Sequence, residues 1–166
     1  IDGYLPFWGP LQERFDLVLF DMRNHGWNAP SGADGHHYAQ MARDLDSIHL
    51  GITERLGEKT SVGIFHSMSA RAAMKQAVEI GWRWDALVLY DPPNVPPPGH
   101  RHYEAMGIFE RRLMDWAMTR QNRFEEPGEL AREYASNRGH SRWVDGAHDL
   151  MARSILRRDE AGGGWT

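Results

Sequence analysis

A serine lies between an apolar run and a helical pattern, at a spacing that allows nucleophilic chemistry. The β-branched residues Val62 and Ile64 predict a buried strand, and the residues from Arg71 to Val78 predict a helix. Few residues remain between them for the turn that holds Ser67. A sharp strand-to-helix turn presents a serine hydroxyl near the helix N-terminus, where developing negative charge is favoured. Ser67 is therefore a candidate nucleophile for acyl chemistry.

The residues that flank this serine fit such a turn in part. Ser69 is small, but Phe65 stands where a sharp turn of this kind favours a glycine. The alternative is a structural serine that ends a buried strand and caps the next helix. These residues by themselves leave both interpretations open.

The composition is that of an ordinary soluble globular chain. Its 166 residues are 41% hydrophobic and 25% charged, which suits one domain or one domain with a small insertion. The net charge of -4 provides no basic surface, so nucleic acid is not an expected partner. The absence of cysteine excludes disulfides, thiolate metal sites and a cysteine nucleophile. No apolar run is long enough to span a bilayer and no signal peptide is visible, so we expect no membrane insertion and a cytoplasmic location.

Strand and helix patterns alternate as far as Asp91. In chain order they predict a strand, a helix, a strand, a helix and a strand at residues 16–20, 38–56, 62–65, 71–78 and 86–90. Such alternation predicts βαβ units in a parallel sheet, and ligands gather beyond the carboxyl ends of such strands. Asp21, Ser67 and Asp91 all stand at those ends. Their common position strengthens the assignment of Ser67.

The sequence changes character after Asp91. Residues 92–99 are rich in proline and predict a stiff linker, and beyond it three helical patterns follow without a strand. Three short helices make little core alone, so we expect them to cover the carboxyl edge of the sheet. The predicted organisation is a partial core at residues 1–94, an all-helical cap at 95–158 and a return segment towards the core at 159–166.

Taken together, these features resemble the α/β-hydrolase family. Three motifs carry the resemblance: Asp-Met-Arg-Asn-His-Gly at 21–26 is similar to the family's Asp-x-Arg-Gly-His-Gly turn, Phe-His-Ser-Met-Ser at 65–69 to its Gly-His-Ser-Met-Gly elbow, and residues 87–92 to the end of its sixth strand, where a helical cap is commonly inserted. The chain departs from the family at Phe65, Ser69 and Asn24, each of which replaces a glycine. The resemblance implies an α/β fold with a partial parallel-sheet α/β-hydrolase core and an inserted all-helical cap.

The resemblance also implies roles for particular residues. Ser67 would be the nucleophile, the Met68 backbone N–H an oxyanion donor, and Asp91 a possible acid member of the triad. The family's oxyanion loop would lie before Ile1 and its histidine after Thr166, so we expect a fragment that is inactive alone.

Four polar residues around the predicted site would support these groups. They are His66, Asp21, Arg23 and His25. The last three lie in a turn that we expect to bond its own backbone groups, as polar turns commonly do. We expect His66 to point to the other side of its strand from the nucleophile.

The expected function is a serine hydrolase that acts on a carboxylic ester or a similar small acyl substrate through an acyl-enzyme. It requires no cofactor, and no metal site is expected, because no carboxylates or cysteines stand at ligand spacing around the histidines. Two alternatives remain on the same fold: an acyltransferase or cofactor-free enzyme, and a non-catalytic ligand-binding protein. The sequence indicates neither the substrate nor the oligomeric state.

Overall fold

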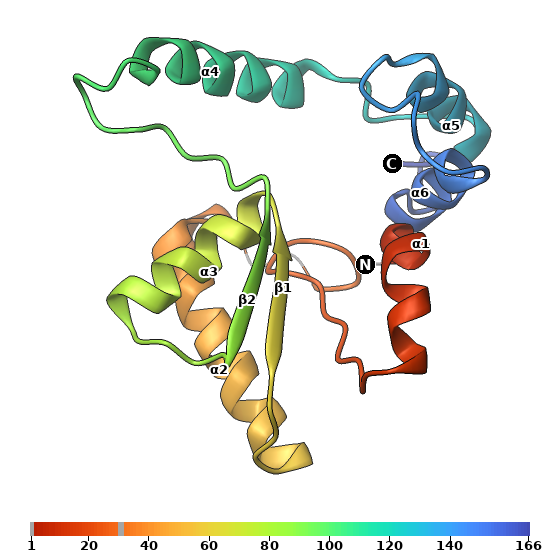
Figure 1. The fold of residues 1–166 in the computed structure, drawn as a ribbon. Coiled ribbons are helices and arrows are strands. Elements are labelled where there is room, and N and C mark those ends of the chain that lie inside the picture. The colour runs from red at the N-terminus through yellow and green to blue at the C-terminus, as the bar shows by residue number, and fades with distance from the viewer. Residues whose placement is uncertain (1, 30–31) are drawn as a thin grey trace. The chain divides into compact units, whose positions relative to one another are not determined.

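The computed structural model describes residues 2–29 and 32–166. The chain divides into two compact units: unit 1 comprises residues 1–21 and 120–166, and unit 2 comprises residues 22–119 (Figure 1). The described residues form six α-helices and one two-stranded parallel sheet, so the chain is mixed α/β.

The sheet of unit 2 joins the two strands predicted on either side of the Ser67 helix. β1 (Val62–His66) and β2 (Ala86–Tyr90) run parallel, with Val62 opposite Ala86 and His66 opposite Tyr90. α3 (Met68–Glu79) connects them and packs against α2 (Tyr38–Leu56), and Figure 1 shows both helices on one side of the strands. The predicted parallel strand–helix–strand unit is confirmed.

Only one face of β1 is covered by the rest of unit 2. Gly63 and Phe65 are buried, whereas Val62, Ile64 and His66 are exposed. This alternation follows from the period of two along a strand, since α2 and α3 lie on a single side. His66 therefore lies on the opposite face from Phe65, and its orientation relative to the Ser67 side chain stays a prediction.

α2 has the bounds that its apolar stripe predicted. Met41, Ala42 and Leu45 are its buried residues, at the spacing of one helical face. The Nδ1 atom of His37 accepts a hydrogen bond from the Gln40 N–H at 3.2 Å and caps the first turn. Gly57 ends the helix with a φ of 76°, a conformation that glycine adopts without strain.

The ring of Phe65 packs into the core at a place that Gly63 leaves open. It meets the buried Trp84 edge to face, with 5.5 Å between ring centroids. A Cβ atom on Gly63 would lie 2.6 Å from the Phe65 ring, 2.8 Å from Leu87 and 3.0 Å from Trp84. The bulky ring of Phe65 is therefore accommodated because Gly63, two positions earlier, has no side chain.

Trp84 connects this ring to both helices. Its Nε1–H donates to Oε1 of the buried Gln76 on α3 at 3.1 Å, and its ring meets His49 on α2 edge to face at 4.8 Å. A buried indole N–H needs such a partner, so the Gln76 carbonyl fixes the orientation of the ring.

The strand predicted at residues 16–20 is wrong. These residues have no regular secondary structure, and Val18 and Leu19 are 45% and 40% exposed. A strand needs a neighbour to take up its backbone hydrogen bonds, and both strands of the described sheet belong to unit 2, whereas residues 16–20 belong to unit 1. An apolar run in the sequence does not indicate whether a partner strand lies beside the segment in the folded chain.

Unit 1 is built from two distant parts of the sequence. Its first part holds two short 3₁₀ segments, Asp2–Tyr4 and Gly9–Glu13, around the single turn α1 (Leu5–Trp8), and its second part holds α5 (Pro127–Ser136) and α6 (Ala147–Ile155). The Asp2–Tyr4 segment packs on α6, and α5 packs on α6. The core cluster consists of Phe124, Leu130, Ala131, Ala152 and Leu156, with Tyr134 and Trp165 packed against it.

The last residues of the chain close this core by backbone pairing. Phe124 and Trp165 exchange two hydrogen bonds, at 2.9 and 2.8 Å. Gly164 has a φ of 79°, and a Cβ there would lie 2.6 Å from the Phe124 carbonyl oxygen. Glycine is therefore required at this close approach.

The three helical patterns after the proline-rich linker are confirmed as α4 (Tyr103–Thr119), α5 and α6. α4 belongs to unit 2 and has no buried residue, whereas α5 and α6 belong to unit 1. The placement of these helices as a cap over the sheet, and the boundaries at residues 94 and 158, stay predictions.

Candidate active site

Ser67 occupies the turn between β1 and α3, as predicted. Its backbone has φ 53° and ψ -122°, a conformation that residues other than glycine rarely adopt. The Ser67 N–H donates to the Tyr90 carbonyl at 2.8 Å, so the parallel ladder holds the serine at the very end of the strand. A strained residue of this kind costs about 1–3 kcal/mol and persists where the surrounding structure imposes it, often at functional sites.

The hydroxyl of Ser67 does not cap the helix that follows. Its side chain makes no capping hydrogen bond to α3, and it has no other hydrogen-bond partner in the part of the chain that the structure describes. The alternative interpretation, a structural capping serine, is therefore wrong. The hydroxyl is left available at the end of the strand.

The turn is held instead by Ser69, which stands two residues after Ser67. Its Oγ donates to the His66 carbonyl at 2.8 Å and accepts from the His66 N–H at 3.1 Å. The hydroxyl therefore connects the end of β1 to the first turn of α3. This role could not be deduced from the small size of the side chain.

Replacing Ser69 by alanine should lower the free energy of unfolding by about 1 kcal/mol, because both bonds to the His66 backbone are lost. Urea unfolding would measure the change. The matched control is Ser47→Ala, whose hydroxyl bonds only the Arg43 carbonyl on an exposed helix surface at 3.0 Å, and which should be nearly neutral. Equal effects of the two substitutions would contradict the role given to Ser69.

Met68 is the first residue of α3, where backbone N–H groups have no partner within the helix. Its N–H makes no hydrogen bond to another described residue. The positive end of the helix dipole lies at the same place and favours negative charge. An unbonded backbone donor therefore follows Ser67 directly in the chain, and its role as an oxyanion donor stays a prediction.

Asp91 is the second non-glycine residue with positive φ at this edge of the sheet. It follows β2 directly, its φ is 43°, and it is exposed. Because His66 lies opposite Tyr90, Ser67 and Asp91 are the next residues along two paired strands. The structure brings the two residues to the same edge, and the role of Asp91 as an acid stays a prediction.

The turn that holds Arg23 and His25 bonds its own backbone, as expected. The Asn28 side chain donates to the Met22 carbonyl at 3.1 Å, and Asn24, which replaces a glycine, adopts φ 62° and donates to the Gly32 carbonyl at 3.2 Å. Asparagine tolerates this left-handed conformation better than most residues, which explains the replacement.

The side chains of this turn have partners of their own. Arg23 binds Asp44 on α2 through two hydrogen bonds, Nε to Oδ2 at 2.7 Å and Nη2 to Oδ1 at 2.6 Å. The Nδ1 atom of His25 lies 2.7 Å from the Arg23 carbonyl, so Nδ1 must carry a proton. Asp21 is the last residue of unit 1. That Asp21, Arg23 and His25 support the groups around Ser67 stays a prediction.

The Arg23–Asp44 pair should make stability depend on acid pH. The hydrogen bond from Arg23 lowers the pKa of Asp44, burial opposes this, and a hydrogen bond from Gln40 adds to the lowering. Since the folded-state pKa lies below the unfolded value of about 3.9, the stabilisation is complete above that value and is lost as the pH falls through the lowered pKa.

Asp44→Asn should therefore lower the urea midpoint at pH 6 and leave a shallower loss of stability between pH 4 and pH 2, both relative to the parent. The control is Glu58→Gln at an exposed position, which should leave the profile unchanged. A parent and an Asp44→Asn profile that run parallel over the whole range would contradict this assignment.

Sequence reasoning assigned no role to Arg71 beyond a place in the predicted helix. The Arg71 N–H donates to the Ser67 carbonyl at 3.1 Å, and the side chain returns to the carboxyl end of β2, where Nη1 donates to the Pro93 carbonyl at 3.0 Å. The guanidinium lies 4.5 Å from the centre of the Tyr38 ring. A positive charge in the first turn of a helix opposes the helix dipole. This unfavourable position is the feature of the sequence that could have drawn attention to Arg71.

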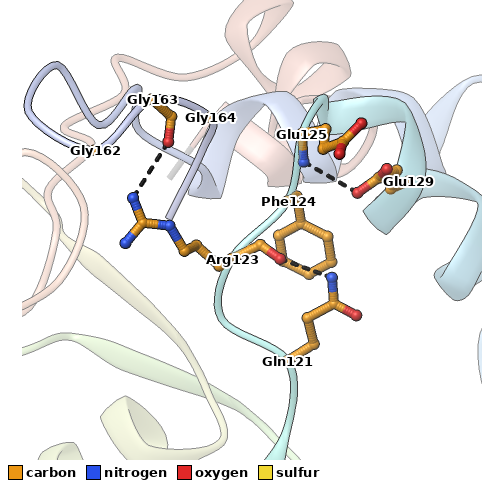
Figure 2. A pocket seen from close by; sticks show the side chains of 8 residues that line it. All are labelled: Gln121, Arg123, Phe124, Glu125, Glu129, Gly162, Gly163 and Gly164. Atoms are coloured by element: carbon orange, nitrogen blue, oxygen red, sulfur yellow. Dashed lines mark hydrogen bonds between the residues drawn. The ribbon is translucent and has the colours of Figure 1, made fainter.

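An open cavity of about 530 Å³ lies in unit 1, away from these residues in sequence (Figure 2). Its lining consists of Gln121, Arg123, Phe124, Glu125, Glu129 and Gly162–Gly164. Figure 2 shows that the lining groups bond one another: Gln121 donates to the Arg123 carbonyl at 2.6 Å, and the Glu125 N–H donates to Glu129 at 3.1 Å. This cavity holds none of the predicted site residues.

Residues 2–29 and 32–166 contain neither a cluster of metal ligands nor a membrane-spanning helix. No three histidine, aspartate or glutamate side chains come together there in a way that could hold a metal ion. No helix in this part of the chain combines the length and the apolar character needed to cross a membrane.

No protein-family model matches the chain, and comparisons with curated proteins and with solved structures also gave no match. The resemblance to the α/β-hydrolase family therefore stays a prediction from the sequence motifs.

Proposed function

We propose that the chain carries the nucleophile of a serine hydrolase that acts on a carboxylic ester or a similar small acyl substrate. The observation that supports this most is the backbone of Ser67: a non-glycine residue held at φ 53° between a strand and a helix, with its hydroxyl not used as a cap. A purely structural serine would have no reason to retain this strain.

The proposed mechanism starts with attack of the Ser67 hydroxyl on the acyl carbon. A histidine takes the proton, because serine is a weak nucleophile at its own pKa. The Met68 N–H stabilises the oxyanion of the tetrahedral intermediate, a contribution of about 3 kcal/mol for one such donor. Collapse of the intermediate releases the alcohol and leaves an acyl-enzyme, which water hydrolyses. We assign the base to none of the histidines described above, and Asp91 is the candidate acid that would orient it.

The accommodation of Phe65 supports this proposal against a non-catalytic protein on the same fold. The substitutions at Phe65 and Ser69, where the family motif has glycines, slightly favour the non-catalytic alternative. Because Gly63 leaves room for the Phe65 ring, the turn reaches its strained conformation without the glycine. The Ser69 hydroxyl supplies two additional bonds across the same turn.

The test is covalent labelling by a fluorophosphonate probe, with the modified residue located by peptide mass spectrometry. In any longer protein that carries this sequence together with a histidine base, Ser67 should be labelled and short-chain nitrophenyl esters should be hydrolysed. In the 166 residues alone, labelling should be slow, because the hydroxyl remains a neutral alcohol. Failure to label Ser67 in the longer protein would overturn the proposal, and rapid hydrolysis by the 166 residues would place the base within them.

A further inference from the structure

The guanidinium of Arg71 is fixed at the same edge of the sheet as Ser67. Arg71 and Ser67 are joined through the backbone of one helical turn, and both bond the segment that leaves β2: Ser67 through the Tyr90 carbonyl and Arg71 through the Pro93 carbonyl. The Tyr38 ring holds one face of the guanidinium by a cation–π contact at 4.5 Å. The charge is therefore positioned and does not move freely in solvent.

The hydrogen-bonding capacity of this guanidinium is only partly used. Of its five N–H groups, those of Nη1 serve the Pro93 carbonyl, and a longer contact of 3.5 Å reaches Glu110 on α4. Nε and Nη2 have no hydrogen-bond partner among the described residues, and the side chain is 36% exposed. A planar guanidinium with unused N–H donors can bind a carboxylate through two parallel hydrogen bonds.

Glu110 shows that a carboxylate can approach this guanidinium. Its oxygen lies 3.5 Å from Nη1, its side chain is 45% exposed, and α4 has no buried residue. An exposed pair at this distance contributes little, so a ligand carboxylate with better geometry can displace it. Glu110 then acts as a weak internal competitor at the same group.

We propose that Arg71 selects an acyl substrate that carries a carboxylate of its own, that is, a monoester of a short dicarboxylic acid. This inference rests on the proposed function of Ser67. Ser67 precedes α3 and Arg71 lies in its first turn, and the Arg71 N–H bonds the Ser67 carbonyl at 3.1 Å, so a substrate bound by both residues spans a short distance. A glutarate monoester is the probe of this class, because it carries an ester and a free carboxylate on one short chain. Arg71 is a specificity residue in this account, and Ser67 remains the nucleophile.

The experiment has an activity arm, performed on a protein that hydrolyses nitrophenyl esters through Ser67. It compares 4-nitrophenyl hydrogen glutarate with its neutral methyl ester. The parent should favour the anionic substrate, and Arg71→Gln should lower that preference by about tenfold to a hundredfold through KM, with the neutral ester changed little. The control is Arg83→Gln, which removes an arginine paired with Asp46 at 2.6 Å and should keep the preference. An unchanged preference in Arg71→Gln would overturn the inference while leaving the proposed function intact.

The second arm measures binding of glutarate itself, by NMR titration of the 166-residue chain, and does not need catalysis. Arg71→Gln should weaken binding by a similar factor, Arg71→Lys should restore part of it, and Glu110→Gln should tighten it severalfold by removing the competitor. If no ester is hydrolysed but glutarate binds through Arg71, the proposed function fails and the carboxylate site stands. If glutarate does not bind the parent, or binds Glu110→Gln no more tightly, the carboxylate site is wrong even if Arg71→Gln fails to fold.

Discussion

Replacing Ser67 by glycine should make the protein more stable by about 1 kcal/mol while abolishing covalent labelling. Glycine adopts φ 53° without the steric cost that serine meets there, about 1–3 kcal/mol. The greater flexibility of glycine in the unfolded chain removes about 0.5–1 kcal/mol of this gain. In a longer protein that supplies the histidine base, loss of the hydroxyl should also lower ester turnover by several orders of magnitude, since nucleophile and base act as a unit. Urea unfolding and probe labelling, performed on the same preparation, measure the two effects.

Ser67→Ala separates the two contributions. Alanine removes the hydroxyl but keeps the Cβ atom, so it should abolish labelling without the gain in stability. A structural serine would behave differently, because loss of a useful hydrogen bond destabilises both variants. If the glycine variant is no more stable than the alanine variant, the strain at Ser67 has been assigned wrongly.

Replacing Gly63 by alanine should destabilise the protein by about 1–3 kcal/mol, the usual cost of overpacking a core. The added Cβ would lie 2.6 Å from the Phe65 ring and 2.8 Å from Leu87, and neither neighbour is the free end of an exposed chain. The turn at Ser67 is attached to Phe65 through one residue, so labelling of Ser67 should slow as well. Thermal or urea unfolding measures the first effect and probe kinetics the second.

Gly51→Ala is the matched control for this substitution. Gly51 lies inside α2, and no atom lies within 4 Å of the position that an added Cβ would take, so alanine should stabilise the helix by about 1 kcal/mol. Combining Gly63→Ala with Phe65→Leu should recover part of the loss, because the smaller side chain vacates the contested space. A double variant no better than Gly63→Ala alone would show that Phe65 is not the residue that requires the glycine.

The elements of unit 2 that hold Ser67 could be predicted because each is specified by nearby residues. The stripe from Met41 to Leu45 and the stop at Gly57 define α2, and the β-branched and apolar runs define β1 and β2. The run at residues 16–20 is similar in composition, yet it forms no strand. β1 and β2 pair with each other, whereas residues 16–20 have no neighbouring strand in the described part of the chain, and this difference is a property of the tertiary structure.

For the candidate site, the position of the serine could be predicted from the sequence, whereas its surroundings could not. The position of Ser67 in a turn follows from the short distance between a strand pattern and a helix pattern. The contacts of Arg71 with Tyr38 and Pro93 join segments that are distant in the sequence, so no local pattern encodes them. The accommodation of Phe65 by Gly63 is local, but it depends on the direction of one ring, which spacing alone does not define.

The division of unit 1 between the two ends of the sequence has a consequence for synthesis on the ribosome. Residues 22–119 are contiguous, so we expect unit 2 to complete its contacts while the chain is still growing. The first segment has no such option, because Gly3 packs closely against Met151 of α6, which is translated much later. At usual rates of translation the delay is about ten seconds or more. During that interval the Asp2–Tyr4 segment lacks the surface of α6 on which it packs, and we expect it to take up its native structure only after α6 has been made.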